Sequence, residues 1–433
     1  MNIKNYKQTE IGFIPEDWNT VLLKDVSIKI GSGATPKGGK KSYIDNGKYS
    51  LIRSQNIFDD KFDYNGLAYI NKHQAKELQN VEVMEGDVLL NITGASLGRV
   101  HIVPEEILPA RVNQHVSILR TNKKLDSYFL YCFLRQNKIK KYMMNFNAGA
   151  TREALTKRMI ENFTIPLPSI EEQKRISKIF IKIDNKIKLN NKMNEKLEKI
   201  GQALFKHWFI DFEFPNEDGK PYKSSGGEMV DSELGMIPQG WKVEPILNVS
   251  DLLSGGTPKT SEGKYWNGPI NWVSVKDVSQ NINDFIISTE KKITKIGLEK
   301  SNAKLLPQNT IIISSRGTVG NICIIGKEMA INQSNYGLKA KISIMDSYIY
   351  YYIKNIIETI KSQSYGSVFD TITTRTFKEI KVITPCHNMS DEIFGILNFL
   401  SNKRLALKYF NNNLHHIKKI LLPKLISGKI RVI

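Results

Sequence analysis

A ten-residue phrase occurs twice in this chain. Residues 9–18 read TEIGFIPEDW and residues 232–241 read SELGMIPQGW, with five identical positions at an offset of 223 residues. Further matched segments follow both copies, at offsets that fall from 223 to 217. Because matched sequences must fold the same way, this repeat constrains the fold more than any other feature. The chain is a duplication of one unit of about 200 residues, which is too long for a solenoid repeat.

The matched segments come in the same order in both halves. They are a Gly-rich loop (33–37 and 255–259), a strand-like run (86–93 and 309–315), a loop that ends in glycine (94–98 and 316–320), an Asn-Gln pair (113–114 and 332–333) and a segment that precedes a long helix (155–168 and 372–385). Short β-like runs mix with helical ones in each half. This predicts a mixed α/β class for each globular part.

Each copy is predicted to end in a long helix. Ser169 and Glu172 have the spacing of a capping box, in which each side chain satisfies a backbone amide of the first turn. Apolar residues then recur every seven positions, and the pattern returns 217 residues later. So narrow a seam favours pairing of the two helices with each other. Packing of each helix on its own domain is the alternative.

Two seam positions are predicted in each helix. The first holds Ile176, Ile183, Asn190, Leu197 and Leu204 in one helix and Ile393, Leu400, Leu407, Leu414 and Leu421 in the other. The second lies three residues later in each case and includes Ile179, Met193, Ile200, Ile396, Phe410 and Ile417. Polar Asn190 can fix the register of such a pair.

The charge and the cysteines narrow the functional classes. A net charge of +19 and a pI near 9.5 are typical of proteins that bind polyanions. Lysine enrichment is weak evidence alone, because an AT-rich genome also produces it. The three cysteines are far apart and fit a reducing cytosol better than disulfides or zinc. No signal-peptide core and no run of about 18 apolar residues is present, so we expect a cytoplasmic protein without a membrane partner.

A search for catalytic motifs finds none. The stretch GATPKGGKKS (33–42) resembles a phosphate-binding loop, but Ala34 stands where the first glycine is required and Lys41 where the hydroxyl residue is required. The chain has no HExxH motif and no [DN]PP[FY] motif, which an amino-methyltransferase needs. We therefore expect no catalytic residue, no metal ion and no cofactor.

Several motifs together carry a resemblance. They are the pair IGFIPEDW and LGMIPQGW, the block GGTPKTSEGKYWNGPINWVSVKDV (255–278), the loop SRGTVG (315–320), the second Asn-Gln pair and IPLPSIEEQKRI (165–176). In this order, with the duplication and the helices, the chain resembles the DNA-specificity subunit of type I restriction–modification systems over nearly all of its length. The first copy departs from the pattern, because its loop TGASLG (93–98) lacks the arginine of the second.

The resemblance implies a fold and a function. The fold is two globular α/β target recognition domains separated by two long helices that form an antiparallel coiled coil, with a pseudo-twofold internal repeat. Each domain reads one half of a bipartite, asymmetric site on double-stranded DNA, and the coiled coil sets the gap between the halves. Two modification (adenine methyltransferase) subunits dock on the coiled coil, and restriction (motor and nuclease) subunits join for cleavage. The subunit itself is non-catalytic.

We predict the following domain boundaries. The first recognition domain covers residues 1–168, the first long helix 169–212, a polar linker 213–231, the second recognition domain 232–386 and the second long helix 387–433. The linker is rich in Gly, Ser and Pro. The residues expected to form the coiled coil and to dock subunits are Ile176, Ile183, Leu197, Leu204, Ile393, Leu400, Leu414 and Leu421.

The repeat also sorts the polar residues. Positions that match between halves serve the shared fold, so Trp18 and Trp241 are interpreted as scaffold. Positions that differ at matched sites are where two half-sites can be distinguished, and Arg, Lys, Gln and Asn suit base edges. Ordinary surface drift is the alternative, and phosphate contacts are commoner than base contacts. The Asn-Gln pairs match, which favours a shared structural role over base reading.

The candidate DNA-binding residues lie in the matched loops of both copies. In the first copy they are Thr35, Lys37, Lys40, Arg53, Gln55, Asn56, Ser96, Arg99, Thr151 and Arg152. In the second copy they are Thr257, Lys259, Ser274, Lys276, Asp277, Ser315, Arg316, Thr318 and Ser367. Two other functions stay open. One is a DNA-binding protein that acts without methyltransferase partners, and the other is an enzyme with an unrecognised site.

Overall fold

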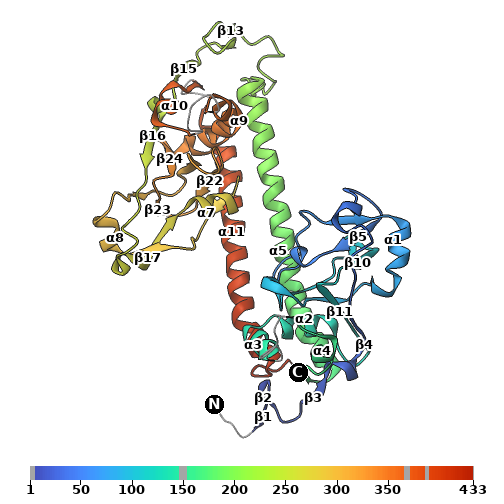
Figure 1. Cartoon of the computed structure of the whole chain (residues 1–433). Helices are drawn as coiled ribbons and strands as arrows, with labels where there is room; N and C mark the ends of the chain where they lie inside the picture. The colour runs from blue at the N-terminus through green and yellow to red at the C-terminus, as the bar shows by residue number, and fades with distance from the viewer. Residues whose placement is uncertain (1–4, 146–153, 365–370, 386–389, 433) are drawn as a thin grey trace. The chain divides into compact units, whose positions relative to one another are not determined.

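The computed structural model describes residues 5–145, 154–364, 371–385 and 390–432 (Figure 1). The chain divides into two compact units. The first consists of residues 1–186 and 414–433, and the second of residues 187–413. Each unit contains a globular α/β domain and a part of both long helices. The predicted mixed α/β class and duplicated architecture are confirmed.

The first unit contains two four-stranded sheets. One is antiparallel with strand order β4-β11-β8-β9, and the other has the order β6-β5-β10-β7 with β5 and β10 parallel. The strands are β4 (Ser27–Ser32), β5 (Tyr49–Ile52), β6 (Ala68–Ile70), β7 (Glu82–Val83), β8 (Val88–Asn91), β9 (Val100–Ile102), β10 (Ala110–Val112) and β11 (Val116–Thr121). Alternate residues of β8 enter two different cores, Leu89 one and Leu90 the other, so this strand is buried on both faces.

The second unit repeats this plan. A five-stranded sheet has the order β16-β24-β21-β22-β18, and a four-stranded sheet has the order β19-β17-β23-β20 with β17 and β23 parallel. The strands are β16 (Ser250–Ser254), β17 (Trp266–Val273), β18 (Phe285–Ile286), β19 (Lys292–Ile293), β20 (Leu305–Leu306), β21 (Ile311–Ser314), β22 (Ile322–Ile325), β23 (Met329–Ile331) and β24 (Asn335–Ala340). Here Ile312 enters one core and Ile313 another. The parallel pair and the doubly buried strand are therefore reproduced.

The repeated phrase places a buried tryptophan in each unit. Trp18 is 1% exposed and Trp241 is 5% exposed, which confirms their interpretation as scaffold. Both phrases have a glycine with positive φ, Gly12 at 112° and Gly235 at 93°. Only glycine adopts these angles without strain. The shared letters of the phrase are thus explained by packing and backbone geometry.

Each tryptophan is covered by residues that follow a long helix. In the first unit the Arg431 guanidinium lies 5.7 Å from the Trp18 ring centroid, and it pairs with Asp17 at 2.8 Å and with Glu172 at 2.7 Å. Arg431 also lowers the pKa of the Asp17 carboxyl through their hydrogen bond. In the second unit Phe214 stacks on Trp241 with centroids 5.0 Å apart. Arg431 and Phe214 are 217 residues apart, at matched places of the repeat.

The strands next to each phrase also hold the start of a helix. In the first unit β3 (Asn19–Leu22) pairs with β12 (Thr164–Leu167), and α5 (Ile170–Phe205) follows β12. Ser169 Oγ accepts a hydrogen bond from Glu172 N at 3.2 Å, as the capping motif predicted. In a full capping box the Glu172 side chain would accept a hydrogen bond from the Ser169 backbone amide. Here the Glu172 carboxylate accepts from Trp18 Nε1 at 3.1 Å and from Arg431. The second unit pairs β15 (Lys242–Pro245) with β25 (Lys381–Thr384).

The two long helices pack together in antiparallel order (Figure 1). The second helix is α11 (Ser390–Ile426). In the second unit Asn190 Nδ2 donates to Asn411 Oδ1 at 2.7 Å, and the Glu198 carboxylate pairs with the Arg404 guanidinium. In the first unit Asp184 pairs with Lys418. As residue numbers rise along α5 they fall along α11, so the predicted antiparallel pairing is confirmed and Asn190 is a buried contact between the helices.

One of the two predicted seam positions is wrong. The first faces inward, since Ile176, Ile393 and Leu400 are buried. The second does not, because Met193 is 44% exposed and Ile200 is 48% exposed. The buried positions lie four residues after the first seam instead of three. They hold Phe180 and Gly201 in α5, and Leu397, Arg404, Asn411, Lys418 and Leu425 in α11.

The Glu198–Arg404 pair is the buried charge centre of the second unit. Arg404 is 1% exposed and Glu198 is 9% exposed. Glu198 also accepts hydrogen bonds from Tyr350 at 3.0 Å and Tyr351 at 3.2 Å, and it pairs with Lys354. Removal of one member of such a network leaves a desolvated charge incompletely paired. The pair therefore contributes to the alignment of α5 with α11.

We expect Arg404→Met to lower the free energy of unfolding by about 3 kcal/mol, because it leaves the buried Glu198 carboxylate with reduced compensation. The double variant Glu198→Gln with Arg404→Met should recover part of this loss. Urea unfolding followed by tryptophan fluorescence measures the change. Lys403→Met, at the exposed neighbouring position, is the matched control. Equal unfolding midpoints for Arg404→Met and the control would contradict this account.

Candidate nucleic-acid interface

Four loops meet at one edge of the domain in the first unit. The loop after β4, the loop after β8, the turn between β10 and β11, and the residues after β5 are tied by backbone hydrogen bonds. Gly33 N donates to Asn113 O at 3.1 Å, Ile92 N to His115 O at 3.0 Å, and Asn113 N to Ile52 O at 3.1 Å. These loops carry most of the candidate residues of the first copy. The fold therefore gathers side chains that are far apart in the sequence.

The second unit closes the same edge with two equivalent bonds and a third that is shifted by one residue on each segment. Gly256 N donates to Ile331 O at 3.0 Å, Ser315 N to Ser334 O at 2.9 Å, and Asn332 N to Val273 O at 3.0 Å. Asn332 Oδ1 accepts from Ser334 N at 3.2 Å, as Asn113 Oδ1 accepts from His115 N at 3.1 Å. The predicted shared structural role of the two asparagines is confirmed.

A threonine–glutamine hydrogen bond is also common to both edges. Thr35 Oγ1 donates to Gln114 Oε1, and Thr257 Oγ1 donates to Gln333 Oε1. Both glutamines are exposed. The two threonine candidates thus have the same partner in both copies, and they position a glutamine that reaches solvent.

Cationic candidates divide into exposed and braced side chains. Lys37 is 93% exposed, with its Nζ 3.8 Å from Glu77 Oε1, and Lys40, Lys259 and Arg316 are exposed as well. Three others are held by neighbours. The Arg53 guanidinium lies 5.4 Å from the Tyr43 ring, the Arg99 guanidinium lies 4.5 Å from the Phe58 ring, and Lys276 Nζ is 2.5 Å from Glu290 Oε2. The neighbours of Arg53, Arg99 and Lys276 fix the directions of these three side chains. The exposed cations are less restrained and can contact DNA phosphates.

Three candidates are buried and are reassigned to holding the loops. Asn56 is fully buried, and its side chain bonds Arg53 N at 3.0 Å and Asp63 O at 2.9 Å. Asp277 is 4% exposed and accepts from Ser274 N at 2.9 Å, while Ser274 caps a short helix. Ser315 is 4% exposed and donates to Ser334 O at 2.9 Å. The sequence predicts DNA contacts at these residues. Asn, Asp and Ser cap loops and short helices as well as contact bases, so residue type alone does not separate the two roles.

The remaining candidates have mixed placements. Gln55 is exposed beside Gly66 O at 3.5 Å, and Ser96 faces Thr93 O at 3.5 Å. Thr318 is exposed and lies 3.1 Å from Ser279 Oγ. Thr151, Arg152 and Ser367 lie outside the described residues.

Thr93 and His115 belong to the same edge, although the sequence analysis passed over them. Thr93 Oγ1 lies 2.7 Å from His115 Nδ1, and Gln114 Nε2 lies 3.2 Å from His115 Nε2. The strand registers match Thr93 to Arg316 and His115 to Ser334. At both positions the side chains differ between the copies, although the strands that carry them pair in the same register. Alignment of the strands β8 and β21 would have revealed this signal.

The helix pair presents apolar side chains to solvent. Met193 and Phe410 are matched by the repeat and are 44% and 48% exposed. Ile200 and Ile417 are also matched and are 48% and 44% exposed. The eight residues predicted both to form the coiled coil and to dock subunits face inward or are half-buried. The exposed positions therefore offer more apolar surface to another chain than these eight do.

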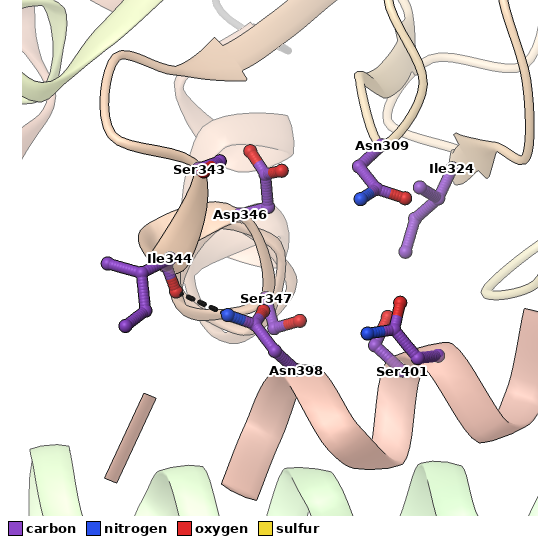
Figure 2. A pocket seen from close by; sticks show the side chains of 9 residues that line it. Asn309, Ile324, Ser343, Ile344, Asp346, Ser347, Asn398 and Ser401 are labelled. Atoms are coloured by element: carbon purple, nitrogen blue, oxygen red, sulfur yellow. Dashed lines mark hydrogen bonds between the residues drawn. The ribbon is translucent and has the colours of Figure 1, made fainter. Parts of the chain in front are cut away.

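A polar cavity in the second unit has no catalytic constellation among the described residues that line it. It has a volume of about 210 Å³ and lies at the start of α9 (Asp346–Ser364) beside α11 (Figure 2). Asn398 Nδ2 donates to Ile344 O at 2.7 Å across it. Burial raises the pKa of the Asp346 carboxyl, which pairs with Lys339. The other polar groups are hydroxyls and amides, which need an adjacent base to react.

The two cysteines among the described residues are buried. Cys132 is fully buried, which raises the pKa of its thiol to about 12, and burial raises the pKa of Cys323 in the same way. A thiol that stays protonated is a poor nucleophile. Within the described residues no group of three His, Cys, Asp or Glu side chains is arranged to hold a metal ion. In the same part of the chain, no helix is long and apolar enough to cross a membrane.

We expect Asn56→Ala to lower the free energy of unfolding by about 1–3 kcal/mol, because two backbone groups lose a buried partner. Gln55→Ala, at the exposed neighbour, should change it by less than about 0.5 kcal/mol. Thermal unfolding of both variants measures the difference. Similar stability of the two variants would mean that Asn56 does not hold the loop.

A family model described as the type I restriction modification DNA specificity domain matches residues 15–199 and again residues 238–414. Two relatives are similar over most of their length. The putative type I restriction enzyme MjaX specificity subunit of Methanocaldococcus jannaschii is 28% identical, with 99% of this chain and 97% of that protein covered. The type I restriction enzyme HindI specificity subunit of Haemophilus influenzae is 23% identical, with coverage of 88% and 99%.

The fold has a counterpart among solved structures. The S subunit of a type I restriction–modification system from M. genitalium superposes with a TM-score of 0.58 at 16% identity. The match covers 94% of this chain and 96% of that one. At this level of identity the likeness concerns the fold alone.

Proposed function

Since the chain belongs to the type I restriction–modification DNA specificity family, we propose that its two α/β domains each read one half of a bipartite, asymmetric site on double-stranded DNA. The chain is the non-catalytic specificity subunit of such an enzyme. Its two long helices hold the domains at a fixed separation, and this separation sets the gap between the half-sites. Catalysis comes from the other subunits.

One observation carries the proposal. The two loop edges have the same frame, fixed by equivalent backbone bonds, but different side chains at equivalent points. Thr93 and His115 stand in one domain where Arg316 and Ser334 stand in the other. A common frame places both domains on DNA in the same way, and different side chains present different donors and acceptors to the bases. Two unlike half-sites follow from this arrangement.

The charges support a duplex as the ligand. Exposed Lys37 and Lys259 occupy matched positions beside the two edges. Arg316 adds an exposed guanidinium to the second edge. Cations in these places suit phosphate contacts, which position a protein on DNA before bases are read. The net charge of +19 acts in the same direction at long range.

We expect deletion of this gene to abolish adenine methylation at one two-part asymmetric motif with a fixed gap. Genome-wide mapping of methylated adenine in the host, with and without the gene, measures this. The strain also expresses a modification (methyltransferase) subunit of a type I system, and reintroduction of the deleted gene is the control. An unchanged methylation map under these conditions would refute the proposal at the level of both target and partner.

The exposed apolar side chains of the helices favour docked partners over a DNA-binding protein that acts alone. Met193 with Ile200, and Phe410 with Ile417, are equivalent under the repeat. Exposed apolar groups at regular spacing are typical of protein interfaces. We infer two equivalent docking places, one for each of two modification subunits. The restriction subunits, which supply the motor and nuclease, join this assembly for cleavage.

We expect Ile200→Lys to remove one modification subunit from the complex, and Ile417→Lys to remove the other, because a charge at a buried apolar contact weakens binding by roughly tenfold or more. Native mass spectrometry of the purified complex measures the stoichiometry. Lys199→Ala, at the adjacent exposed position, is the control. Two bound modification subunits in the double variant would exclude this surface as the docking place.

A further inference from the structure

The same threonine–glutamine pair stands at the loop edge of both domains, although the loops around it differ. Gly33 and Gly255 bring the threonine loop against the turn that carries the glutamine. A Cβ on Gly33 would lie 1.6 Å from Val112 O, and one on Gly255 would lie 2.3 Å from Ile331 O. A side chain at either glycine would therefore displace the loop. The two domains hold this pair in the same tight frame.

The hydrogen bond from the threonine fixes the orientation of each glutamine amide, that is, the positions of its Oε1 and Nε2 atoms. A threonine hydroxyl donates to Oε1 of Gln114 and to Oε1 of Gln333. Each carbonyl oxygen keeps a second lone pair, and each amide nitrogen keeps a proton to donate. In the first domain His115 Nε2 lies 3.2 Å from Gln114 Nε2, so the amide is held at both ends. Glutamines are flexible, and such bracing reduces the entropy that binding would cost.

An oriented, exposed glutamine has the pattern that matches adenine. In the major groove adenine offers the N6 amino group as a donor and N7 as an acceptor. Oε1 of the glutamine accepts from N6, and Nε2 donates to N7. Lys37 and Lys259, each two residues after the threonine, are placed to contact the phosphates on either side of the base.

The match between the copies favoured a structural role for both members of each Asn-Gln pair, and the asparagines have that role. We propose instead that the exposed Gln114 and Gln333 are matched adenine contacts, one in each half-site, and that Thr35 and Thr257 are their positioning residues. This rests on the proposed function of the two domains. The differing side chains nearby, Thr93 and His115 against Arg316 and Ser334, then read the bases that make the half-sites unlike. Each half-site contains one adenine–thymine pair at the equivalent place.

The test is the methylated motif produced by the complete methyltransferase complex that contains a substituted chain. Gln114→Glu replaces the donor with a second acceptor, and carboxylates accept from the N4 amino group of cytosine. We expect the preference at one base pair of the first half-site to move from adenine to cytosine by roughly tenfold or more, with the second half-site unchanged. Gln333→Glu should change only the second half-site.

Two further variants separate orientation from contact. Thr35→Val and Thr257→Val retain the glutamines but remove the bond that orients them. Each should weaken discrimination at the same base pair as the corresponding glutamine variant, without a shift towards cytosine. Where a glutamate variant gives no methylation at all, Gln114→Ala and Gln333→Ala replace it, and these should accept several bases at that one pair.

The outcomes are distinguishable. Unchanged motifs in all the glutamine variants, from a complex that still methylates, would overturn the inference and leave the proposed function standing. A change at several positions of one half-site would also overturn it, because the glutamine would then support the loop and not read a base. Failure of the unsubstituted chain to direct methylation would instead be a failure of the proposed function.

Discussion

A buried tryptophan in each repeat is the point on which the rest of the structure depends. The strand after Trp18 pairs with β12, which leads into α5, and the residues after α11 cover the Trp18 ring. In the second unit Phe214, which follows α5, stacks on Trp241. These contacts tie both ends of α5 and the C-terminal end of α11 to a tryptophan phrase. The buried hydrogen bond between Asn190 and Asn411 fixes the local register of the two helices.

The same logic applies at the loop edges. Backbone bonds and close glycine contacts hold the frame, so substitutions at the exposed points do not disturb the fold. Thr93 and Arg316 illustrate this, since a hydroxyl and a guanidinium occupy equivalent places on the same scaffold. In this fold one set of residues has the task of stabilising the loops, and a second set has the task of contacting DNA. The buried Asn56, Asp277 and Ser315 belong to the first task, although their chemistry would suit the second.

Much of the fold was predictable because it rests on periodicity. The duplication, the two long helices, the cap at Ser169 and the buried tryptophans follow from repeated letters and seven-residue spacing. The second seam was not predictable from hydrophobicity, because its buried positions hold Arg404, Asn411 and Lys418 while the neighbouring apolar residues face solvent. At the loop edges, exposed cations such as Lys37 could be found from the repeat. The correspondence of Thr93 with Arg316 could be found by alignment of β8 with β21. The contact between Thr93 and His115 could not, since it depends on how β8 pairs with β11.

The polar seam has a consequence for pairing between different copies of the chain. Asp184 and Glu198 lie seven residues on either side of Asn191, and Arg404 and Lys418 lie seven residues on either side of Asn411. Two α5 helices paired antiparallel about Asn191 would place the two acids opposite each other, and two α11 helices about Asn411 would do the same with two cations. Like charges in a partly desolvated seam repel. Only α5 with α11 brings acid against base, so the charges of the seam disfavour every pair of like helices from two copies of the chain.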